Sequence, residues 1–398
     1  MKRQITNTTH RRAVYTLPCL ILTLFLLTCQ QQGANESHQS IQLEENHFPV
    51  KLSIEHAIGF QLIYHNHWKE LQLYRHYNDQ ADTVRFALVL RGQPAPDGFS
   101  ESRILQIPVQ RLASVSTTHL GMFEALDALL KLKGIEAAKY VSSKSVKKAI
   151  DEGKIVELAP SGMLNTEKVV AEGIEVLMGV GYPNAQNDTY QSLENAGVPV
   201  LLNAEWQEKT LLGRAEWVKM LAALLNKEAK AQKIFQEIER KYNATLAKIE
   251  GENLPSPMAI TGLVQGDAWF VAGGESFANH LMQLANVQYP WSETANTGSV
   301  KLDFETVYNY GLKADYWLVP STAKTMKELL QTDSRFADFK SVQNQKVYNI
   351  YGSYNSGGGN DFYESAVMQP HVVLKDILSI FHPELFPKHE LVYYNRLK

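Results

Sequence analysis

The sequence predicts an α/β protein with two lobes, each built on a central sheet flanked by helices and joined by a helical connector. Three observations support this prediction. The chain has 398 residues, enough for two or three domains. Its composition, 44% hydrophobic and 20% charged, is that of a globular protein. Short apolar runs alternate with helical stretches, a pattern typical of a parallel sheet covered on both faces.

The first 28 residues are expected to be a lipoprotein signal peptide. Arg11 and Arg12 precede Ala13–Leu27, an apolar run without charge that is short for a membrane span but suits a signal-peptide core. It ends in Leu26-Leu27-Thr28-Cys29, which resembles a bacterial lipobox, although Thr28 departs from the usual Gly, Ala or Ser. The alternative is a signal-anchor helix that stays in the membrane.

The mature chain is then expected to begin at Cys29, lipidated and anchored to the membrane in the periplasm. Residues 29–49 are predicted to be a flexible polar tether. The other cysteine, Cys19, lies in the signal peptide, so the mature chain has no disulfide. The net charge of −3 and the lack of a basic stripe argue against nucleic-acid binding.

Residues 50–210 are predicted to form the N-terminal lobe, which begins with extra antiparallel strands. Alternating runs bounded by turn residues indicate these strands at 59–64, 68–74, 84–90 and 104–107. A helix is expected at 120–131. The further short apolar runs of this lobe, predicted as strands, are 112–115, 138–141, 155–158, 176–180 and 198–202.

Residues 211–250 are predicted to contain the connecting helix, Gly213–Leu225, and a following helix, Lys227–Ile249. Pro255-Ser256-Pro257 ends the second helix, because proline cannot continue it. Residues 251–398 form the predicted C-terminal lobe. Helical and strand-like segments alternate again in this lobe. The predicted elements are 258–263, a helix near 276–285, and segments 304–310, 316–319, 326–330, 346–350 and 366–381.

Several short motifs follow one another in a characteristic order. They are Pro108–His119, Gly197–Val200, Glu205-Trp206, Leu212–Trp217, Gly273–Phe277, Leu302–Glu305, Ala314–Val319, Phe339–Tyr348, Asn360–Tyr363, Pro370, Leu374–Asp376 and Phe381–Leu385. This order resembles the periplasmic iron-complex and vitamin B12 binding proteins of ABC importers, over roughly three quarters of the chain. Asn286 departs from the resemblance, because many relatives have glycine there.

The resemblance implies a monomeric, lipid-anchored solute-binding protein whose lobes are joined by one long rigid helix. It implies capture of an iron complex, a ferric siderophore, and delivery to the permease subunits of an importer; cobalamin and heme are the alternatives. It implies no enzymatic activity and no cofactor. The chain also lacks the G-x-S-x-G and H-E-x-x-H motifs of two enzyme classes.

Loops at the carboxyl ends of the predicted strands are expected to line the ligand cleft, where open α/β sheets bind ligands. Aromatic groups there can bury an organic chelate, and hydroxyl and amide groups can bond its periphery. The predicted ligand contacts are Thr117, Thr118, His119, Tyr140, Tyr182, Trp206, Trp269, Phe270, Tyr354, Asn360 and Tyr363.

Simpler roles compete at several of these positions. The hydroxyls of Ser116–Thr118 can cap a helix instead of binding an anion. His119 can bond a neighbour, and Trp269 can fill the core. Gly357-Gly358-Gly359 allows close backbone approach, either to a ligand or within a surface loop.

Acidic residues on the two lobes are expected to dock on the permease, as the resemblance implies, and Glu124 and Glu275 are the candidates. No metal site is predicted. Six histidines fall between His38 and His76, but no compact acidic set accompanies them, and scattered roles are favoured. A free-metal binding protein, with ligands such as His119, His280 and His371, is the remaining alternative.

Overall fold

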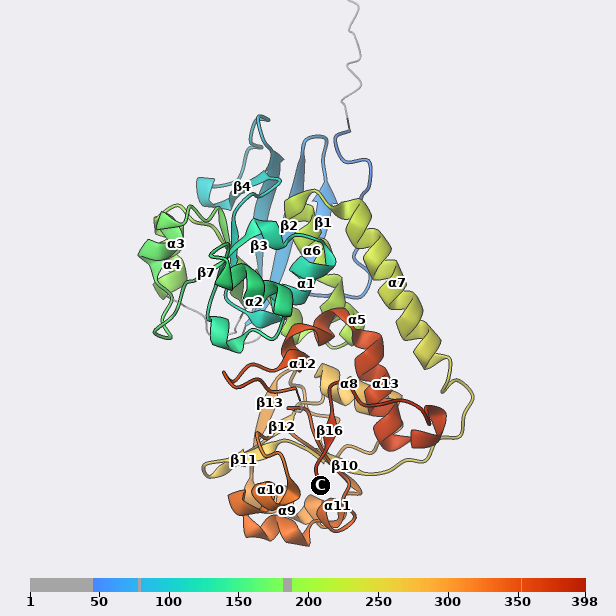
Figure 1. Cartoon of the computed structure of the whole chain (residues 1–398). Coiled ribbons are helices and arrows are strands. Elements are labelled where there is room, and N and C mark those ends of the chain that lie inside the picture. The colour runs from blue at the N-terminus through green and yellow to red at the C-terminus, as the bar shows by residue number, and fades with distance from the viewer. Residues whose placement is uncertain (1–45, 78–79, 182–187, 352) are drawn as a thin grey trace, which may run out of the picture. The chain divides into compact units, whose positions relative to one another are not determined.

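The computed structural model describes residues 46–77, 80–181, 188–351 and 353–398, which belong to one compact unit (Figure 1). The predicted signal peptide, Cys29 and nearly all of the predicted tether lie outside the described residues. Two α/β lobes follow one another along the chain, as the sequence predicts. No helix among the described residues combines the length and apolar character needed to cross a membrane.

The first sheet contains β1 (Phe60–Tyr64), β2 (Trp68–Tyr77), β3 (Gln80–Leu90) and β4 (Ile104–Ile107), in that order. The first three strands are antiparallel, as predicted. The antiparallel prediction is wrong for β4, which runs parallel to β3. The reason is that residues 91–103, including the 3₁₀ helix η1 (Glu101–Arg103), return the chain to the level of Ala87, so that β4 runs beside the last four residues of β3 in the same direction.

The second sheet is parallel, and its strand order is β7-β6-β5-β8-β9. Its strands are β5 (Leu112–Ser114), β6 (Leu132–Ile135), β7 (Val156–Glu157), β8 (Val176–Val180) and β9 (Val200–Asn203). The strand predicted at 138–141 is wrong, because residues Ala138–Tyr140 form the 3₁₀ helix η4. The helix predicted to reach residue 131 ends at Ala125, since Asp127 adopts a left-handed φ of 47°.

Helices cover both faces of this parallel sheet. The helices α1 (Leu120–Ala125) and α2 (Lys144–Asp151) cover one face of the sheet, and the side chains buried there belong to the main hydrophobic core. The helices α3 (Thr166–Ala171) and α4 (Asp188–Asn195) cover the other face, where the buried side chains form a second, smaller core. Strand β8 shows the alternation that separates them, because Val176 and Met178 join the first core and Leu177 joins the second.

The helix that joins the lobes is α7 (Glu228–Leu246), and the prediction of Gly213–Leu225 is wrong. That segment forms two short helices, α5 (Leu211–Glu216) and α6 (Val218–Leu225), which are completely buried. Asn226, in a left-handed conformation with φ 53°, ends α6. Figure 1 shows α7 running from α6 toward the C-terminal lobe, where it packs on α13.

The C-terminal lobe combines two sheets. One has the order β10-β14-β15-β16, in which only β16 is antiparallel to its neighbour, and the other is the antiparallel sheet β11-β12-β13. The strands are β10 (Ala259–Thr261), β11 (Leu263–Gln265), β12 (Ala268–Ala272), β13 (Ser299–Asp303), β14 (Tyr316–Val319), β15 (Val347–Asn349) and β16 (Asn395–Arg396).

Helices surround these two sheets. They are α8 (Phe277–Leu284), α9 (Phe304–Gly311), α10 (Met326–Thr332), α11 (Lys340–Gln343), α12 (Asp361–Glu364) and α13 (Pro370–Phe381). The remaining 3₁₀ helices of the described chain are η2 (Thr117–His119), η3 (Leu129–Lys131), η5 (Glu205–Gln207), η6 (Ser334–Asp338), η7 (Ala366–Met368) and η8 (Pro383–Leu385).

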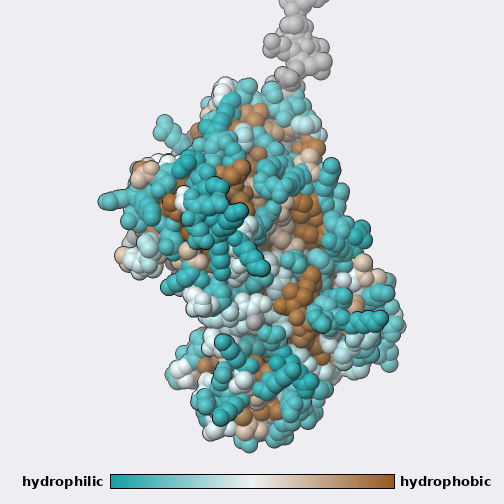
Figure 2. Space-filling view, in the orientation of Figure 1, coloured by the Kyte–Doolittle hydropathy of each residue, from teal (hydrophilic) through white to brown (hydrophobic). Residues whose placement is uncertain are grey.

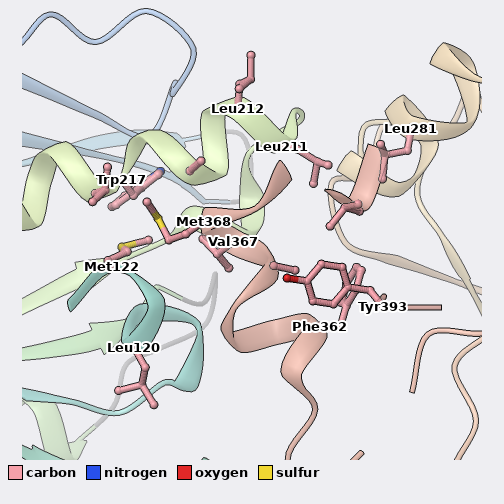
Figure 3. Close-up of a cluster of buried hydrophobic side chains, with 14 of the residues drawn as sticks. Leu120, Met122, Leu211, Leu212, Trp217, Leu281, Phe362, Val367, Met368 and Tyr393 are labelled. Atoms are coloured by element: carbon pink, nitrogen blue, oxygen red, sulfur yellow. The ribbon is translucent and has the colours of Figure 1, made fainter. Parts of the chain in front are cut away.

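One hydrophobic core continues from lobe to lobe. Figure 3 shows Met122 of α1 close to Met368 of η7, and Leu211 of α5 on the side of Leu281 of α8. Figure 2 shows hydrophobic residues gathered at the waist of an otherwise mainly hydrophilic face. Because apolar side chains of both lobes share one core, separating the lobes widely would expose it to water.

Candidate functional site

A hollow of about 770 Å³ lies between the N-terminal lobe and the segment that follows β15. Its walls come from parts of the chain more than 200 residues apart. The lining residues are Glu124, Ser142, Ser143, Lys144, Ser145 and Lys147 from one side, and Ser353, Tyr354, Asn355, Asp361, Glu364 and Ser365 from the other. The volume is within the usual range of small-molecule sites, roughly 300–1,000 Å³.

The two walls are joined by hydrogen bonds at Glu364, which is 1% exposed. Its carboxylate accepts the backbone N–H of Ser142 at 2.6 Å and that of Ser143 at 2.8 Å. Burial raises the pKa of Glu364, although these two N–H groups act in the opposite direction. Asn355 adds a third connection, since its Nδ2 donates to the carbonyl of Val141 at 2.9 Å.

The N-terminal wall carries groups of both charges. Ser143 caps α2, and its hydroxyl also donates to Glu124 at 2.6 Å. The hydroxyl of Ser145 donates to the same carboxylate. Lys144 and Lys147 contribute ammonium groups from the first turn of α2. The hollow can therefore bond both donors and acceptors of a polar ligand.

The glycine-rich loop lies directly against the N-terminal lobe. A Cβ atom on Gly357 would lie 2.1 Å from the carbonyl oxygen of Lys139, and one on Gly359 would lie 1.8 Å from that of Tyr140. No side chain fits at these distances. The close backbone approach expected from the sequence is thus present, and its partner here is the protein's own backbone.

Three of the aromatic residues predicted to contact the ligand lie around this loop, namely Tyr140, Tyr354 and Tyr363. The rings of Tyr351 and Tyr354 stack at 5.6 Å, and Tyr363 lies edge-on to Tyr351 at 6.3 Å. Tyr354 is 44% exposed and lines the hollow. A Cβ atom on Gly358 would lie 3.5 Å from the ring of Tyr140. Burial raises the pKa of Tyr363, so its hydroxyl stays protonated.

Thr117 and Tyr140 meet beyond the carboxyl ends of β5 and β6, although β6 was not predicted. The space between them is small, about 10 Å³, enough for roughly one water molecule. Thr118 is occupied locally, because its hydroxyl bonds that of Ser116 at 2.8 Å and its N–H donates to the same oxygen. The capping role of Ser116 is therefore present in the structure.

His119 has the simpler of its two predicted roles. Its side chain is 1% exposed, and its Nδ1 lies 2.8 Å from the hydroxyl of Ser114. Burial lowers the pKa of His119 to about 4, so the imidazole is neutral at pH 7. The prediction of a ligand contact is wrong at His119, since a ring held inside the lobe does not reach a bound molecule.

Trp269 belongs to the core of the C-terminal lobe, and its prediction as a ligand contact is wrong. It is fully buried in β12, where its Nε1 donates to the carbonyl of Thr261 at 3.0 Å. The glycine near it serves a tight hairpin turn, Gly266-Asp267, with Gly266 at a φ of 63°. Phe270, next in the strand, points to the opposite face and is half-buried.

Asn360 is a structural residue, which corrects its prediction as a ligand contact. Its Oδ1 accepts the N–H of Phe362, and its Nδ2 donates to the carbonyl of Ile350, each at 3.1 Å.

Trp206 lies in η5, and its Nε1 donates to the carbonyl of Gly181 at 3.0 Å. Tyr182 lies outside the described residues. The role of Trp206 in ligand binding stays a prediction.

The two predicted docking residues have different surroundings. Glu124 lines the hollow and accepts two serine hydroxyls, and docking by Glu124 stays a prediction. The side chain of Glu275 is 44% exposed, and its carboxylate lies 2.9 Å from Nζ of Lys209 in the other lobe. Docking by Glu275 stays a prediction.

The histidines of the free-metal alternative do not converge. Within residues 46–77, 80–181, 188–351 and 353–398, neither His119 nor His280 nor His371 belongs to a group of three metal-binding side chains. Burial lowers the pKa of His280 and of His371, which is the expected effect on histidines partly enclosed by protein.

Comparison with known proteins decides the family. The periplasmic binding protein family matches residues 112–354, more than half of the chain. The chain belongs to the periplasmic binding protein family. This confirms the resemblance read from the motif order. The protein is a substrate-binding protein of the ABC transporter type and not an enzyme.

The relatives of this periplasmic binding protein are distant in sequence. It is 25% identical over 398 residues to an uncharacterized lipoprotein of Methanocaldococcus jannaschii, with 92% of each chain covered. A possible iron-binding (periplasmic solute-binding) protein from Staphylococcus epidermidis has a TM-score of 0.53 at 14% identity, covering 69% of this chain and 98% of that one. The periplasmic heme-binding protein HutB of Vibrio cholerae has a TM-score of 0.51 at 18% identity, covering 67% and 98%. The two structures share the fold.

The family match begins at Leu112, the first residue of β5. The sheet of β1–β4 therefore lies before the matched region. The sequence predicted these extra strands without a role, and the structure attaches them to the binding protein by a buried ion pair between Lys69 and Glu228.

The hollow also shows which residues the sequence analysis missed. Ser142, Lys144, Lys147, Asp361 and Glu364 line it but were not predicted as ligand contacts. The only signal for Ser142 and Lys144 is Ser142-Ser143-Lys144, a helix-capping pattern that was obscured by the strand predicted over 138–141. Asp361 and Glu364 lie within or beside a family motif, but nothing in the sequence shows what they face.

Proposed function

We propose that this periplasmic binding protein captures a ferric siderophore in the hollow between its lobes and delivers it to the membrane subunits of an ABC importer. A lipid on Cys29 would keep the protein at the membrane. The observation that carries the proposal is the hollow itself, which has a ligand-sized volume and walls from both halves of the chain.

The chemistry of the walls favours a polar chelate over heme or cobalamin. Tyr354 is the one aromatic side chain among the described residues of the lining, and the other eleven of the twelve lining residues carry a hydroxyl, carboxylate, ammonium or amide group. A porphyrin would bury a large apolar ring, and such surface is stabilised by apolar walls rather than charged ones. A siderophore presents oxygen-rich groups around its metal, which these side chains can hydrogen-bond.

Titration of the purified chain separates the three ligands. Tryptophan fluorescence is followed while a ferric hydroxamate, a ferric catecholate, cobalamin or heme is added. Saturable quenching by one of the ferric siderophores supports the proposal. Saturation only with heme or cobalamin would replace the ligand, and no saturation with any of the four would overturn the proposed function.

A pair of matched tyrosine variants tests whether the ligand binds in the hollow. Tyr354 lines the hollow and is 44% exposed, whereas Tyr310 is 38% exposed and does not line it. Tyr354→Ala is expected to weaken siderophore binding about tenfold, the loss of one stacked ring and its hydroxyl. Tyr310→Ala is expected to bind like the original chain. Equal affinities in both variants would move the site away from the hollow.

The lipid anchor is supported by the lipobox-like segment and by the lipoprotein relatives. Cys29→Ala is expected to release the protein from the membrane fraction of producing cells and to remove the mass of the lipid. Retention of the variant in the membrane would instead favour an uncleaved signal anchor.

A further inference from the structure

A short segment before β1, residues 53–59, is held along α5 and α7 by buried carboxylates; we call it the strap. The carboxylate of Glu216 accepts the backbone N–H groups of Glu55, His56 and Ala57 at 2.7–3.1 Å. Glu208 accepts the next two N–H groups, those of Ile58 and Gly59. Five consecutive N–H groups are thus bonded, which fixes the backbone of the strap.

Three side chains converge where the strap meets α7. One donor atom from each of Glu55, His56 and Glu239 lies within 4.8 Å of the other two. Nε2 of His56 is 2.8 Å from Oε1 of Glu239. The ring of His56 also contacts that of Phe235 on the same helix, at 5.7 Å between centroids, which restricts its orientation.

We propose that Glu55, His56 and Glu239 bind one divalent transition-metal ion, with Zn²⁺ as the favoured class. One imidazole nitrogen and two carboxylates form a donor set typical of such ions, and a solvent molecule would complete four-coordination. In a tetrahedral zinc site neighbouring donors are about 3.3 Å apart. Nε2 of His56 and Oε1 of Glu239, which are 2.8 Å apart, must therefore separate slightly, and the carboxylate of Glu55 must move toward them. The exposed side chain of Glu55 can make this movement.

Charge around the three side chains suits a cation. Glu216 lies beneath the strap, and its own charge is balanced by Lys219, whose Nζ is 2.5 Å away. Lys219 also donates to the carbonyl of Ser53 and packs over the ring of Phe235. This leaves the charges of Glu55 and Glu239 without a lysine or arginine ion pair among the described residues.

The site would fasten the N-terminal strap to the helix that joins the lobes. The strap follows the predicted tether, and α7 contacts α6 in one lobe and α13 in the other. No residue of the site lines the hollow. The inference therefore stands independently of the proposed ligand, and it departs from the sequence analysis, which expected no metal site.

The test is a zinc titration of the full-length chain in competition with a chromophoric chelator, repeated with Co²⁺ to record its visible spectrum. One equivalent of Zn²⁺ is expected to bind, with a tetrahedral Co²⁺ spectrum. His56→Ala and Glu239→Gln are each expected to weaken binding by roughly tenfold or more. The matched controls, His67→Ala and Glu237→Gln, should bind like the original chain.

Thermal unfolding provides a second readout, because a metal that binds only the folded state raises the Tm. Zn²⁺ is expected to raise the Tm of the original chain and of both controls, and to leave that of His56→Ala unchanged. Circular dichroism without metal verifies that each variant is folded. The inference is overturned if no stoichiometric Zn²⁺ binds, or if His56→Ala and Glu239→Gln retain full affinity. Siderophore binding should be equal in all four variants, which separates this result from the proposed function.

Discussion

The buried carboxylate of Glu364 accepts the backbone N–H of Ser143 at 2.8 Å. This bond joins α12, which follows β15 along the chain, to the residue directly before α2 in the N-terminal lobe. The hydroxyl of the same serine accepts the N–H of Val146 and donates to Glu124. This residue pair thus helps to set the separation of the two walls of the hollow, together with the bonds from Ser142 to Glu364 and from Asn355 to Val141.

Glu364→Gln is expected to lower both stability and siderophore affinity. The amide keeps one carbonyl acceptor but places an NH₂ group against a backbone N–H, which leaves a buried donor unpaired at a cost of about 1–3 kcal/mol. Urea unfolding measures the stability, and the fluorescence titration measures the affinity. Glu384→Gln is the control, because the side chain of Glu384 is 63% exposed. A Glu364→Gln variant as stable as that control would refute the role of this bond.

His119 is expected to make the protein less stable at acidic pH. Burial lowers its pKa to about 4, whereas the unfolded chain has the ordinary value near 6.5. Between these values the unfolded state binds a proton that the folded state does not. The free energy of unfolding therefore falls as the pH drops through this window, by about 2 kcal/mol at pH 5.

Urea unfolding at pH 7.5 and pH 5 checks this expectation in the original chain and in His119→Gln. The variant lacks the titrating ring, so its loss of stability between the two pH values should be smaller by about 2 kcal/mol. A proton NMR titration of the His119 ring gives an independent readout. A midpoint near 6.5, or the same pH dependence in both proteins, would contradict the prediction.

The regular parts of the fold could be predicted because local patterns determine them. The continuous apolar run Val176-Leu177-Met178 predicts a strand covered on both faces, and its side chains do join two different cores. Strand β6 was not predicted, because Lys133 and Gly134 interrupt its apolar run directly after the helix expected at 120–131. The helix joining the lobes was misplaced because the resemblance implied one rigid interlobe helix, which was assigned to Gly213–Leu225, whereas α7 is the helix that runs toward the second lobe.

The site was less accessible to sequence reasoning than the fold. Glu364 bonds backbone N–H groups that lie more than 220 residues earlier in the chain, and any residue type can supply those groups. Trp269 shows the opposite error, since a tight two-residue turn looked like a ligand loop. Tyr140 and Tyr354 follow β6 and β15 along the chain, and their role in ligand binding stays a prediction.

Glu275→Lys is expected to impair delivery to the importer while leaving siderophore binding intact. Its partly exposed carboxylate can pair with a cation of a membrane subunit, and charge reversal would repel that cation. Uptake of radiolabelled ferric siderophore by cells should fall about tenfold or more. Lys209→Ala is the control, because it removes the same ion pair inside the protein but keeps the carboxylate. Equal uptake by Glu275→Lys and Lys209→Ala would exclude docking by Glu275.

Gly359→Ala is expected to disrupt the hollow through the backbone. The new Cβ would lie 1.8 Å from the carbonyl oxygen of Tyr140, so the loop must move away from the N-terminal lobe. Such overpacking costs about 1–3 kcal/mol, and the displaced Tyr354 should weaken siderophore binding. Gly298→Ala is the matched control, because its Cβ would meet Trp206 only at an ordinary 3.8 Å. Denaturant unfolding measures the stability of both variants, and the fluorescence titration measures their siderophore affinity. Equal stability and equal affinity in the two variants would mean that the loop can relax without affecting the walls of the hollow.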